Sequence, residues 1–421
     1  MSIEETLNQE FDVSSPIESE VRSYSRSWPA VFTSAEGSTL YSRNDAYTDF
    51  FAAAGSLNYG HNDPHALSAL INYLSQNGII QTLDMQTEAR LSFLDALQEY
   101  VLQPRGLGDY RVMFTGPTGT NAVEAALKCV RLATGRTEVI AFRGGFHGVT
   151  LGALAASSNA SKRQGGGVPL LNVKRFPFDS PEIDAQEAVE WFERVHFLDR
   201  VDAELPAGVL VETLQGEGGV NVASPEWVRG IATVCARYRV PLIVDEIQAG
   251  CGRTGPFFSF EHYGIKPAVI PVSKSLSGLG LPLSVVLLRE DLDLVTPGQH
   301  NGTFRGSNAS FVTSAACLAK YWADETLKQG TKRKSELALE ALESSGVSSR
   351  FPIKGRGLLL GVELPTGTQA DEVIASCFQR KLLIESSGSE GQVIKIMPPL
   401  TISRPELERG LEIVCDAVRA I

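Results

Sequence analysis

The sequence predicts a two-domain α/β protein whose larger domain holds a doubly wound, mostly parallel sheet. At 421 residues the chain is too long for one small domain and long enough for two sizeable ones. Short apolar runs alternate with amphipathic helical stretches from about residue 91 to residue 306, as in parallel α/β sheets. A long helical stretch and a smaller α+β segment follow. We therefore expect an N-terminal segment that joins the small domain, a large α/β domain and a C-terminal small α+β domain, over residues 1–65, 66–308 and 309–421.

The N-terminal segment carries weaker signals. Its first fifteen residues are polar and acidic, so we expect a loosely attached stretch without a secretory signal. Short extended pieces are expected at residues 30–33 and 39–41. Turn-forming residues then lead to Pro64, which is expected to open a helix that ends near residue 77.

The predicted elements of the large domain alternate along the chain. Strands that are buried on both faces appear in a sequence as short, continuous apolar runs. The predicted strands cover residues 111–114, 138–142, 208–211, 241–244, 269–271 and 284–288. The predicted helices cover residues 91–102, 121–133 and 225–239, and a long helical stretch from 310 to about 342 opens the C-terminal domain.

Composition and charge restrict the classes of function. The net charge of −11 is spread along the chain and argues against nucleic acid or an anionic membrane as a partner. No apolar stretch approaches the ~20 residues that a membrane span needs. The six cysteines form no CxxC pair, which is typical of a reduced, cytoplasmic protein, and we predict no metal site. Cys251 is expected to be a small packed residue.

Residues 115–121 join a predicted strand to a predicted helix and could hold a phosphate. Glycine lets the backbone approach an anion, hydroxyls donate, and the helix N-terminus adds free N–H groups. Thr118, Gly119 and Thr120 are the candidate ligands. Taken alone, the motif is explained about equally well by a strand–glycine–helix turn with a purely geometric role.

Two further strand ends carry residues that suit a flat heterocycle. Phe146 stands among glycines after the strand predicted at 138–142, where its ring could stack on such a ligand. A core phenylalanine with a turn histidine at His147 is the competing interpretation. Asp245 follows the strand predicted at 241–244, and a buried carboxylate is costly unless it meets a cation such as a pyridinium nitrogen. Alternatively, Asp245 caps the next helix.

Lys274 is the candidate nucleophile. It follows a short apolar run and precedes a glycine-rich turn, so a plain surface position is not expected. A lysine in a cofactor pocket near other positive groups has a lowered pKa, can form a Schiff base and can then carry a proton. Gln248 could hydrogen-bond a phenolic oxygen of the ring, and Thr303 adds a hydroxyl beside glycines.

The order and spacing of these motifs resemble those of the subgroup III aminotransferases, the family of ornithine and 4-aminobutyrate aminotransferases. The resemblance extends from about Glu20 to Ser403. It implies a fold type I enzyme that depends on pyridoxal 5′-phosphate and acts on small amino acids and oxo-acids. It also implies a homodimer with shared active sites, or a dimer of dimers.

The resemblance implies a role for each matching residue. Gly119 and Thr120 match the phosphate loop, and Phe146 matches the aromatic that stacks on the ring, with His147 beside it. The other matches are Glu212 and Glu217 in the glutamate motif, Asp245 as the pyridinium partner, Gln248 as its neighbour, Lys274 as the Schiff-base lysine, and Thr303 as the residue that reaches the phosphate of the neighbouring subunit's cofactor.

Several segments are similar to the branch of this family that produces L-2,4-diaminobutanoate. These segments cover residues 19–26, 116–125, 247–255 and 273–278. The similarity implies that an amino group moves from L-glutamate to L-aspartate 4-semialdehyde in a ping-pong reaction, giving L-2,4-diaminobutanoate and 2-oxoglutarate. This reaction commits metabolites to ectoine, and it also feeds siderophore, polyamine and peptide-antibiotic pathways, among which the sequence does not decide.

One departure from the wider family concerns the substrate carboxylate. Many members place an arginine three residues before a Pro-Pro-Leu segment, where it holds the α-carboxylate of glutamate and pairs with a glutamate when empty. This chain has Lys395 there, as the diaminobutyrate branch does, and lysine cannot form the bidentate fork of arginine. We expect Lys395 to pair with Glu217, with a surface lysine as the alternative. Arg253 and Arg305 are other candidate carboxylate ligands.

Other functions keep the same fold. An aminomutase, a related lyase or another ω-amine aminotransferase would use the same residues, and an aminomutase would work without a separate amino donor. A non-catalytic relative would be expected to lack the lysine or the aspartate, and both Lys274 and Asp245 are present. Phe51, Tyr24 and Met85 are candidates, by position alone, for contacts with the distal end of the semialdehyde.

Overall fold

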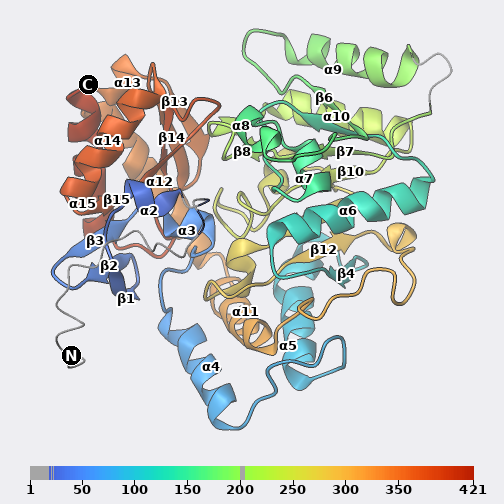
Figure 1. The fold of residues 1–421 in the computed structure, drawn as a ribbon, viewed down its shortest axis with the longest axis horizontal. Helices are drawn as coiled ribbons and strands as arrows, with labels where there is room; N and C mark the ends of the chain where they lie inside the picture. Colours follow the sequence, from blue (N-terminus) through green and yellow to red (C-terminus); the bar gives the residue numbers. More distant parts are fainter. Residues whose placement is uncertain (1–18, 20, 22, 200–203) are drawn as a thin grey trace.

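The computed structural model of the chain describes residues 19, 21, 23–199 and 204–421. The loosely attached stretch predicted at residues 1–15 lies outside these residues. Two regions stand side by side in Figure 1. The large region is built around a seven-stranded sheet, and the small region combines the C-terminal strands and helices with the N-terminal strands.

The seven-stranded sheet forms the centre of the large region. Its strands lie in the order β4 (Arg111–Phe114), β12 (Val285–Leu288), β11 (Val269–Val272), β10 (Leu242–Val244), β7 (Gly208–Val211), β5 (Val139–Phe142) and β6 (Val173–Phe176). β12 is antiparallel to both of its neighbours and the other pairs are parallel, which confirms the predicted mostly parallel sheet. Every residue of β5, β7, β10, β11 and β12 is buried, as their apolar sequences require.

Helices cover both faces of this sheet. Successive residues of a strand point to opposite faces, and β7 shows the result. Leu210 packs in one core cluster with α6, whereas Val209 and Val211 pack in the other cluster with Trp227 of α10. The helices of the region are α4 (Pro64–Ser75), α5 (Glu88–Leu97, continued by a π-helical turn over Gln98–Leu102), α6 (Gly119–Thr134), α7 (Leu151–Ala156), α8 (Ala160–Gln164), α9 (Ala185–Glu193), α10 (Pro225–Arg237) and α11 (Asn308–Tyr321).

The small region has a core of its own. Its antiparallel sheet has the order β13 (Ile353–Arg356), β14 (Leu359–Glu363), β17 (Val393–Ile396) and β16 (Glu385–Ser387). Helices α12 (Thr326–Ser344), α13 (Val347–Arg350), α14 (Gly367–Gln379) and α15 (Arg404–Arg419) belong to the same region, and residues of α12, α14 and α15 share its apolar cluster.

The N-terminal strands join this region through a second small sheet. That sheet has the order β1 (Phe32–Glu36), β2 (Thr39–Ser42), β3 (Ala46–Asp49) and β15 (Leu382–Leu383). β15 pairs with β3 in parallel, so strands far apart in the sequence lie side by side. The remaining short elements are α2 (Tyr24–Ser27), α3 (Ala52–Gly55) and a hairpin of β8 (Leu214–Gln215) and β9 (Asn221–Val222).

The structure differs from the prediction in a few elements. The helical stretch predicted from 310 to about 342 is divided into α11 and α12. The break occurs where the indole of Trp322 donates to the hydroxyl of Tyr59 at 2.9 Å and Asp324 accepts from the N–H of Thr326 at 2.8 Å. β3 and β6 were not predicted, because both are edge or half-exposed strands with polar residues. Among the described residues, no helix is both long and apolar enough to cross a membrane.

Candidate active site

The predicted residues follow four neighbouring strands and lie at one edge of the large sheet. β10 and β7 are parallel and in register, so Asp245 and Glu212 follow them side by side. The N–H of Asp245 donates to the carbonyl of Val211 at 2.9 Å. The other predicted residues at this edge are Phe146 and His147 after β5 and Lys274 after β11.

Asp245 is buried and held by two donors. Nδ1 of His147 lies 2.8 Å from its Oδ2, and the N–H of Ile247 donates to its Oδ1 at 3.0 Å. The second contact is a local turn interaction. No helix begins directly after Asp245 in the described residues, so the alternative that Asp245 caps the next helix is wrong. Burial acts to lower the pKa of His147, but the hydrogen bond and charge of Asp245 outweigh it and raise that pKa. The carboxylate is therefore fixed in orientation by a buried partner.

Glu212 shapes the loop that follows β5. Its Oε2 accepts the N–H of Phe146 at 2.9 Å. Burial raises the pKa of Glu212 to about 8, against the opposing charge of His147. The raised pKa favours the protonated form of Glu212 more than in an ordinary glutamate, and its carboxyl group serves the backbone as an acceptor. We call Asp245, His147 and Glu212 the strand-end cluster.

Lys274 occupies a strained position at the end of β11. Its φ of 51° lies in the left-handed region, which costs a non-glycine residue about 1–3 kcal/mol. Its ammonium donates to the carbonyl of Ala54 at 2.7 Å. Burial lowers the pKa of Lys274, the charge of Glu217 opposes this effect, and the charge of Lys395 adds to it. Lys274 is thus held in place and loses its proton more readily than a surface lysine.

A left-handed turn supplies the acceptor for Lys274. The φ angles of residues 52–54, all alanine, are 47°, 47° and 56°. The hydroxyl of Ser275 donates to the carbonyl of Gly55 at 2.8 Å and anchors this turn beside the lysine. The carbonyl of Ala54 also accepts from Nε2 of Gln248 at 3.2 Å. Two predicted cofactor residues therefore share one backbone oxygen.

Lys395 lies at the centre of a buried ion cluster. Its Nζ is 2.6 Å from Oε1 of Glu217 and 2.8 Å from Oε1 of Glu385, and its side chain is 0% exposed. The structure thus contains the predicted Lys395–Glu217 pair, and the alternative of a surface lysine is wrong. Burial acts to raise the pKa of Glu217, but the charges of Lys395 and Lys274 bring it down to about 2. We call Glu217, Lys395 and Glu385 the ion cluster.

Gln248 connects the ion cluster to the reactive lysine. Its Nε2 donates to Oε1 of Glu217 at 3.0 Å, as well as to the carbonyl that receives Lys274. Its Oε1 is buried and has no hydrogen-bond partner among the described residues. A buried acceptor without a partner is costly, so this oxygen suits a donor on a bound ligand.

The phosphate loop predicted at residues 115–121 forms the start of α6. Thr118 is the N-cap residue, and Gly119 and Thr120 begin the helix. A Cβ at Gly119 would lie 2.9 Å from the side chain of Ile247, so glycine allows the loop to approach the segment after Asp245. The helix N-terminus offers free N–H groups and positive dipole charge to an anion. Together with the ring of Phe146 and the carboxylate of Asp245, these groups fit a phosphorylated heterocycle with a protonated ring nitrogen.

Arg253 and Arg305, the other candidate carboxylate ligands, lie outside the ion cluster. The guanidinium of Arg253 is fully buried and donates to backbone carbonyls, including that of Pro398 at 2.5 Å. These contacts join the segment after β10 to the segment after β17. Arg305 instead pairs with Asp84 at 3.2 Å.

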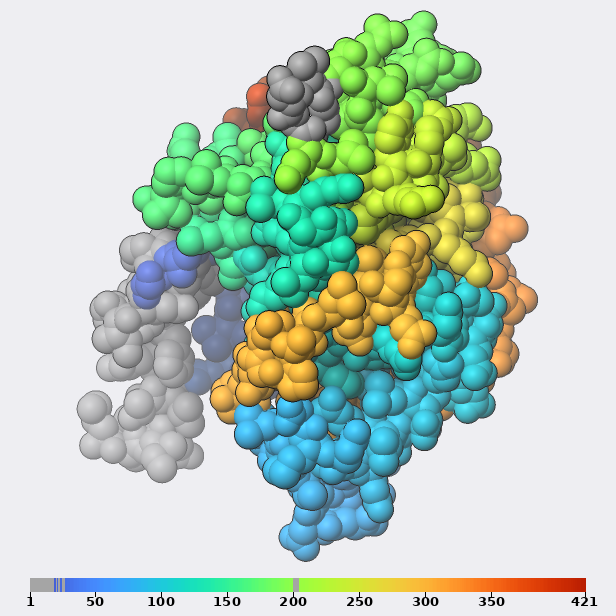
Figure 2. All heavy atoms as spheres, turned by 90° about the vertical axis from the view of Figure 1, so that its right-hand side faces the viewer, coloured from blue at the N-terminus to red at the C-terminus, as the bar shows by residue number. Residues whose placement is uncertain are grey.

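Thr303 is exposed in the segment between β12 and α11. This segment, orange in Figure 2, runs across the outer surface of the large region. An exposed position suits the contact with a neighbouring subunit that the family resemblance implies, and this contact stays a prediction.

Glu385 was not predicted from the sequence, and Tyr24 was predicted only by position. Glu385 lies directly opposite Lys395 in the antiparallel pair β16–β17. A single acidic residue after the apolar run 382–384 was the available signal. Burial and the charge of Glu385 raise the pKa of Tyr24, whose ring lies 4.9 Å from that of Phe51. Met85 is 62% exposed.

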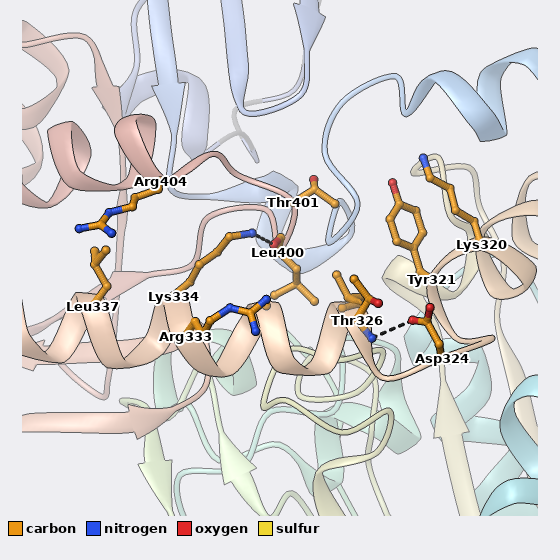
Figure 3. Close-up of a pocket in the computed structure, with 12 residues that line it drawn as sticks. Lys320, Tyr321, Asp324, Thr326, Arg333, Lys334, Leu337, Leu400, Thr401 and Arg404 are labelled. Carbon is orange, nitrogen blue, oxygen red and sulfur yellow. Dashed lines mark hydrogen bonds between the residues drawn. The ribbon is translucent and has the colours of Figure 1, made fainter.

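One of the larger cavities of the molecule lies away from this site. It has a volume of about 700 Å³ and lies between α12 and the loop after β17, with Lys320, Arg333, Lys334 and Arg404 around it (Figure 3). A smaller cavity of about 210 Å³ is lined by Phe146, Glu217 and their neighbours. Only the smaller one adjoins predicted site residues, so we take it as the candidate entry to the active site.

Comparison with known sequences gives one family over nearly the whole chain. The family "Aminotransferase class-III" matches residues 21–418. The diaminobutyrate–2-oxoglutarate transaminase of Nocardia farcinica is 48% identical over 421 residues, covering 99% of this chain and 95% of the relative. The enzyme of the same name from Halomonas elongata is 46% identical, covering 94% of this chain and 96% of the relative.

Solved structures have the same fold. An ornithine aminotransferase from Toxoplasma gondii superposes with a TM-score of 0.81 at 26% identity, covering 93% of this chain and 91% of that one. A Bacillus anthracis aminotransferase superposes with a TM-score of 0.88 over the full length of both chains. Its identity of 21% limits that comparison to the fold.

Proposed function

We propose, from the premise that this chain belongs to the class-III aminotransferase family, that it moves an amino group from L-glutamate to L-aspartate 4-semialdehyde. The products are L-2,4-diaminobutanoate and 2-oxoglutarate. The protein is a pyridoxal-phosphate-dependent aminotransferase, as its family and structural neighbours are. The choice of substrates is supported by the name of the 48% identical relative, which matches 99% of the chain.

The residues at the strand ends are suited to hold the cofactor. Bound pyridoxal phosphate supplies an aldehyde carbon for amines and a ring that accepts electrons from the substrate. We assign the covalent attachment to Lys274, the phosphate to residues 118–120 and the ring face to Phe146. Gln248 presents its unpartnered Oε1 at the same edge, where a donor on the ligand would satisfy it.

Asp245 has the electrostatic role in this proposal. A buried carboxylate beside the ring nitrogen keeps a proton on that nitrogen, because the ion pair is stronger away from water. His147 holds Oδ2 of Asp245 at 2.8 Å and so prevents the carboxylate from turning away. Burial raises the pKa of Glu212, which reduces the competing negative charge beside Asp245.

Lys274 has the proton-transfer role. Its lowered pKa gives a neutral amine at a smaller cost than an exposed lysine would have. With the cofactor and substrate bound, Nζ of Lys274 would be the group that takes the proton from the substrate carbon that carries nitrogen. The left-handed turn at residues 52–54 holds Nζ in position through the carbonyl of Ala54.

Three finer parts of the proposal concern the setting of the enzyme. We propose a homodimer in which Thr303 reaches the phosphate bound by the neighbouring subunit. We propose that the enzyme works in the cytoplasm and supplies diaminobutanoate for ectoine synthesis. A siderophore or antibiotic pathway would use the same product and would leave the chemistry unchanged.

One observation supports the proposal most strongly. Lys274 and Asp245 follow neighbouring strands of the sheet in a chain of this family. The test is a pair of half-reactions on purified, cofactor-loaded protein, followed by absorbance. L-Glutamate and L-2,4-diaminobutanoate should each bleach the visible band of the bound cofactor, and 2-oxoglutarate or the semialdehyde should restore it. A band that neither amine bleaches would leave the cofactor assignment standing and reject the proposed substrates.

A further inference from the structure

Glu385 is the member of the ion cluster to which the family resemblance assigns no role. Its side chain is 6% exposed, and its Oε1 lies 2.8 Å from Nζ of Lys395. The two residues face each other directly across the β16–β17 pair, so the backbone ladder fixes their separation. The same Oε1 lacks a hydrogen bond of good geometry among the described residues. A nearly buried carboxylate is therefore held by charge, with one acceptor left unsatisfied.

The two carboxylates of the ion cluster belong to different kinds of backbone element: one lies in a turn and the other on a strand. Glu217 stands in the turn between β8 and β9, and its side chain also accepts from Gln248. Turning the Glu217 side chain away from Lys395 would cost that contact and leave every strand intact. The backbone of Glu385 is held directly opposite Lys395 by the β16–β17 pair, whereas Glu217 stands in a turn. A substrate carboxylate that approaches Lys395 therefore also approaches the charge of Glu385.

The charge of the ion cluster has a consequence for the two amino donors, and this step rests on the proposed function. One lysine and two glutamates carry one net negative charge. L-Glutamate places a carboxylate on the carbon that reacts, whereas L-2,4-diaminobutanoate reacts at a terminal CH₂ that carries none. The ion cluster lies two contacts from Lys274, through Gln248 and the carbonyl of Ala54. It is close enough to distinguish the two donors by charge.

We propose that Glu385 is a specificity-determining residue, which keeps the ion cluster at one net negative charge and so weakens the binding of an α-carboxylate relative to a terminal amine. Lys395 attracts the carboxylate of glutamate, and Glu385 limits that attraction. The enzyme can then release oxoglutarate and still accept the carboxylate-free end of the other substrate. Burial raises the pKa of Glu385, and the charge of Lys395 opposes that effect.

The decisive variant is Glu385→Gln, which removes the charge and keeps the shape. We expect kcat/KM for L-2,4-diaminobutanoate, divided by that for L-glutamate, to fall at least tenfold, mainly through a lower KM for glutamate. A second measurement needs no turnover. Glutarate, a dicarboxylate without an amine, should bind cofactor-loaded Glu385→Gln at least tenfold more tightly than the unaltered protein, as measured by calorimetry.

Two variants serve as controls. Glu385→Asp keeps the charge and should leave the ratio within about threefold of the original. Glu363→Gln removes a carboxylate on the adjoining strand β14, where Glu363 pairs with Lys354 at 2.7 Å away from the ion cluster, and should change neither measurement. The melting temperature of each variant shows whether it is folded.

The outcomes separate the inference from the proposed function. If the unaltered enzyme uses neither donor, the proposed function fails. If it uses both, and Glu385→Gln leaves the ratio and the glutarate affinity within twofold, the inference is wrong. If the rate falls equally with both donors at an unchanged ratio, Glu385 only positions Lys395, which also overturns it.

Discussion

The strand-end cluster and the ion cluster bury charge in different ways. In the strand-end cluster, one carboxylate meets a histidine, and burial raises the pKa of the other, Glu212, to about 8. In the ion cluster, one lysine faces two carboxylates, and its side chain is 0% exposed. The first cluster stands on neighbouring strands of one sheet. The second joins a turn of the large region to two strands of the small region.

This difference in construction indicates which chemistry each cluster can support. Groups on neighbouring strands of a packed sheet keep their geometry, which suits a cofactor that must be held in one position. Groups contributed by two regions depend on how those regions meet, which suits a site that receives two substrates of different charge in turn. The predictions below test this division, beginning with the largest expected effect.

Replacing the reactive lysine should have the largest effect. Lys274→Ala removes both the attachment point and the proton carrier, so we expect loss of the visible cofactor band and loss of transfer. Absorbance and the half-reaction with L-glutamate measure both. Lys266→Ala is the matched control, because Lys266 is an exposed lysine that donates to the carbonyl of Gly106 and should leave both unchanged. A band and turnover that survive in Lys274→Ala would reject the assignment.

Replacing the strand-end carboxylate should have the next largest effect. Asp245→Asn has the same shape and cannot hold a proton on the ring nitrogen, so we expect the half-reaction rate to fall roughly 10²- to 10⁴-fold. Stopped-flow absorbance measures the rate with each donor. Both donors should be affected alike, because the ring is common to both half-reactions. Asp291→Asn, at an exposed ion pair with Arg289, should have no effect.

Replacing the central lysine of the ion cluster should affect stability as much as activity. Lys395→Met leaves two buried carboxylates without their cation, which we expect to lower the free energy of unfolding by about 3–5 kcal/mol at neutral pH. Urea denaturation measures this. Lys354→Met is the control, because Lys354 pairs with Glu363 at a half-buried site and should cost about 1 kcal/mol or less. Equal losses in the two variants would contradict the special position of Lys395.

The same variant should change how stability depends on pH. The pKa of Glu217 is about 2 in the folded protein, below the ordinary glutamate value of 4.5 that applies in the unfolded chain. A lowered acid pKa stabilises the folded state above the unfolded pKa, and this contribution is lost as pH falls from about 4.5 toward 2. The stability difference between the unaltered protein and Lys395→Met should therefore shrink over that range.

The sequence allowed most of the strand-end cluster to be predicted. Asp245 and Lys274 stand directly after apolar runs, and parallel strands end at a common edge, so their proximity follows from the pattern. The same rule did not give Glu385, because Glu385 begins β16 in the antiparallel sheet of the small region instead of following a strand of the parallel sheet. The surroundings of Arg253 could not be predicted for a related reason. A cation inside a glycine-rich motif suggests a ligand site, and only the structure shows that Nη1 of Arg253 donates to two backbone carbonyls and Nη2 to the side chain of Asn58.

By itself, the sequence determined the fold class, the strand-end residues and the family. The spacing of apolar residues and the polar residues that follow each apolar run are both recognisable within short stretches of chain. Tertiary structure alone decided that three alanines adopt a left-handed turn against Lys274, and that Lys395 is fully buried with Glu385 as a second carboxylate partner beside Glu217. The turn contact joins residues 220 positions apart, and the Lys395–Glu217 contact joins residues 178 positions apart. Such contacts exist only once the two regions have packed together, and no local pattern encodes them.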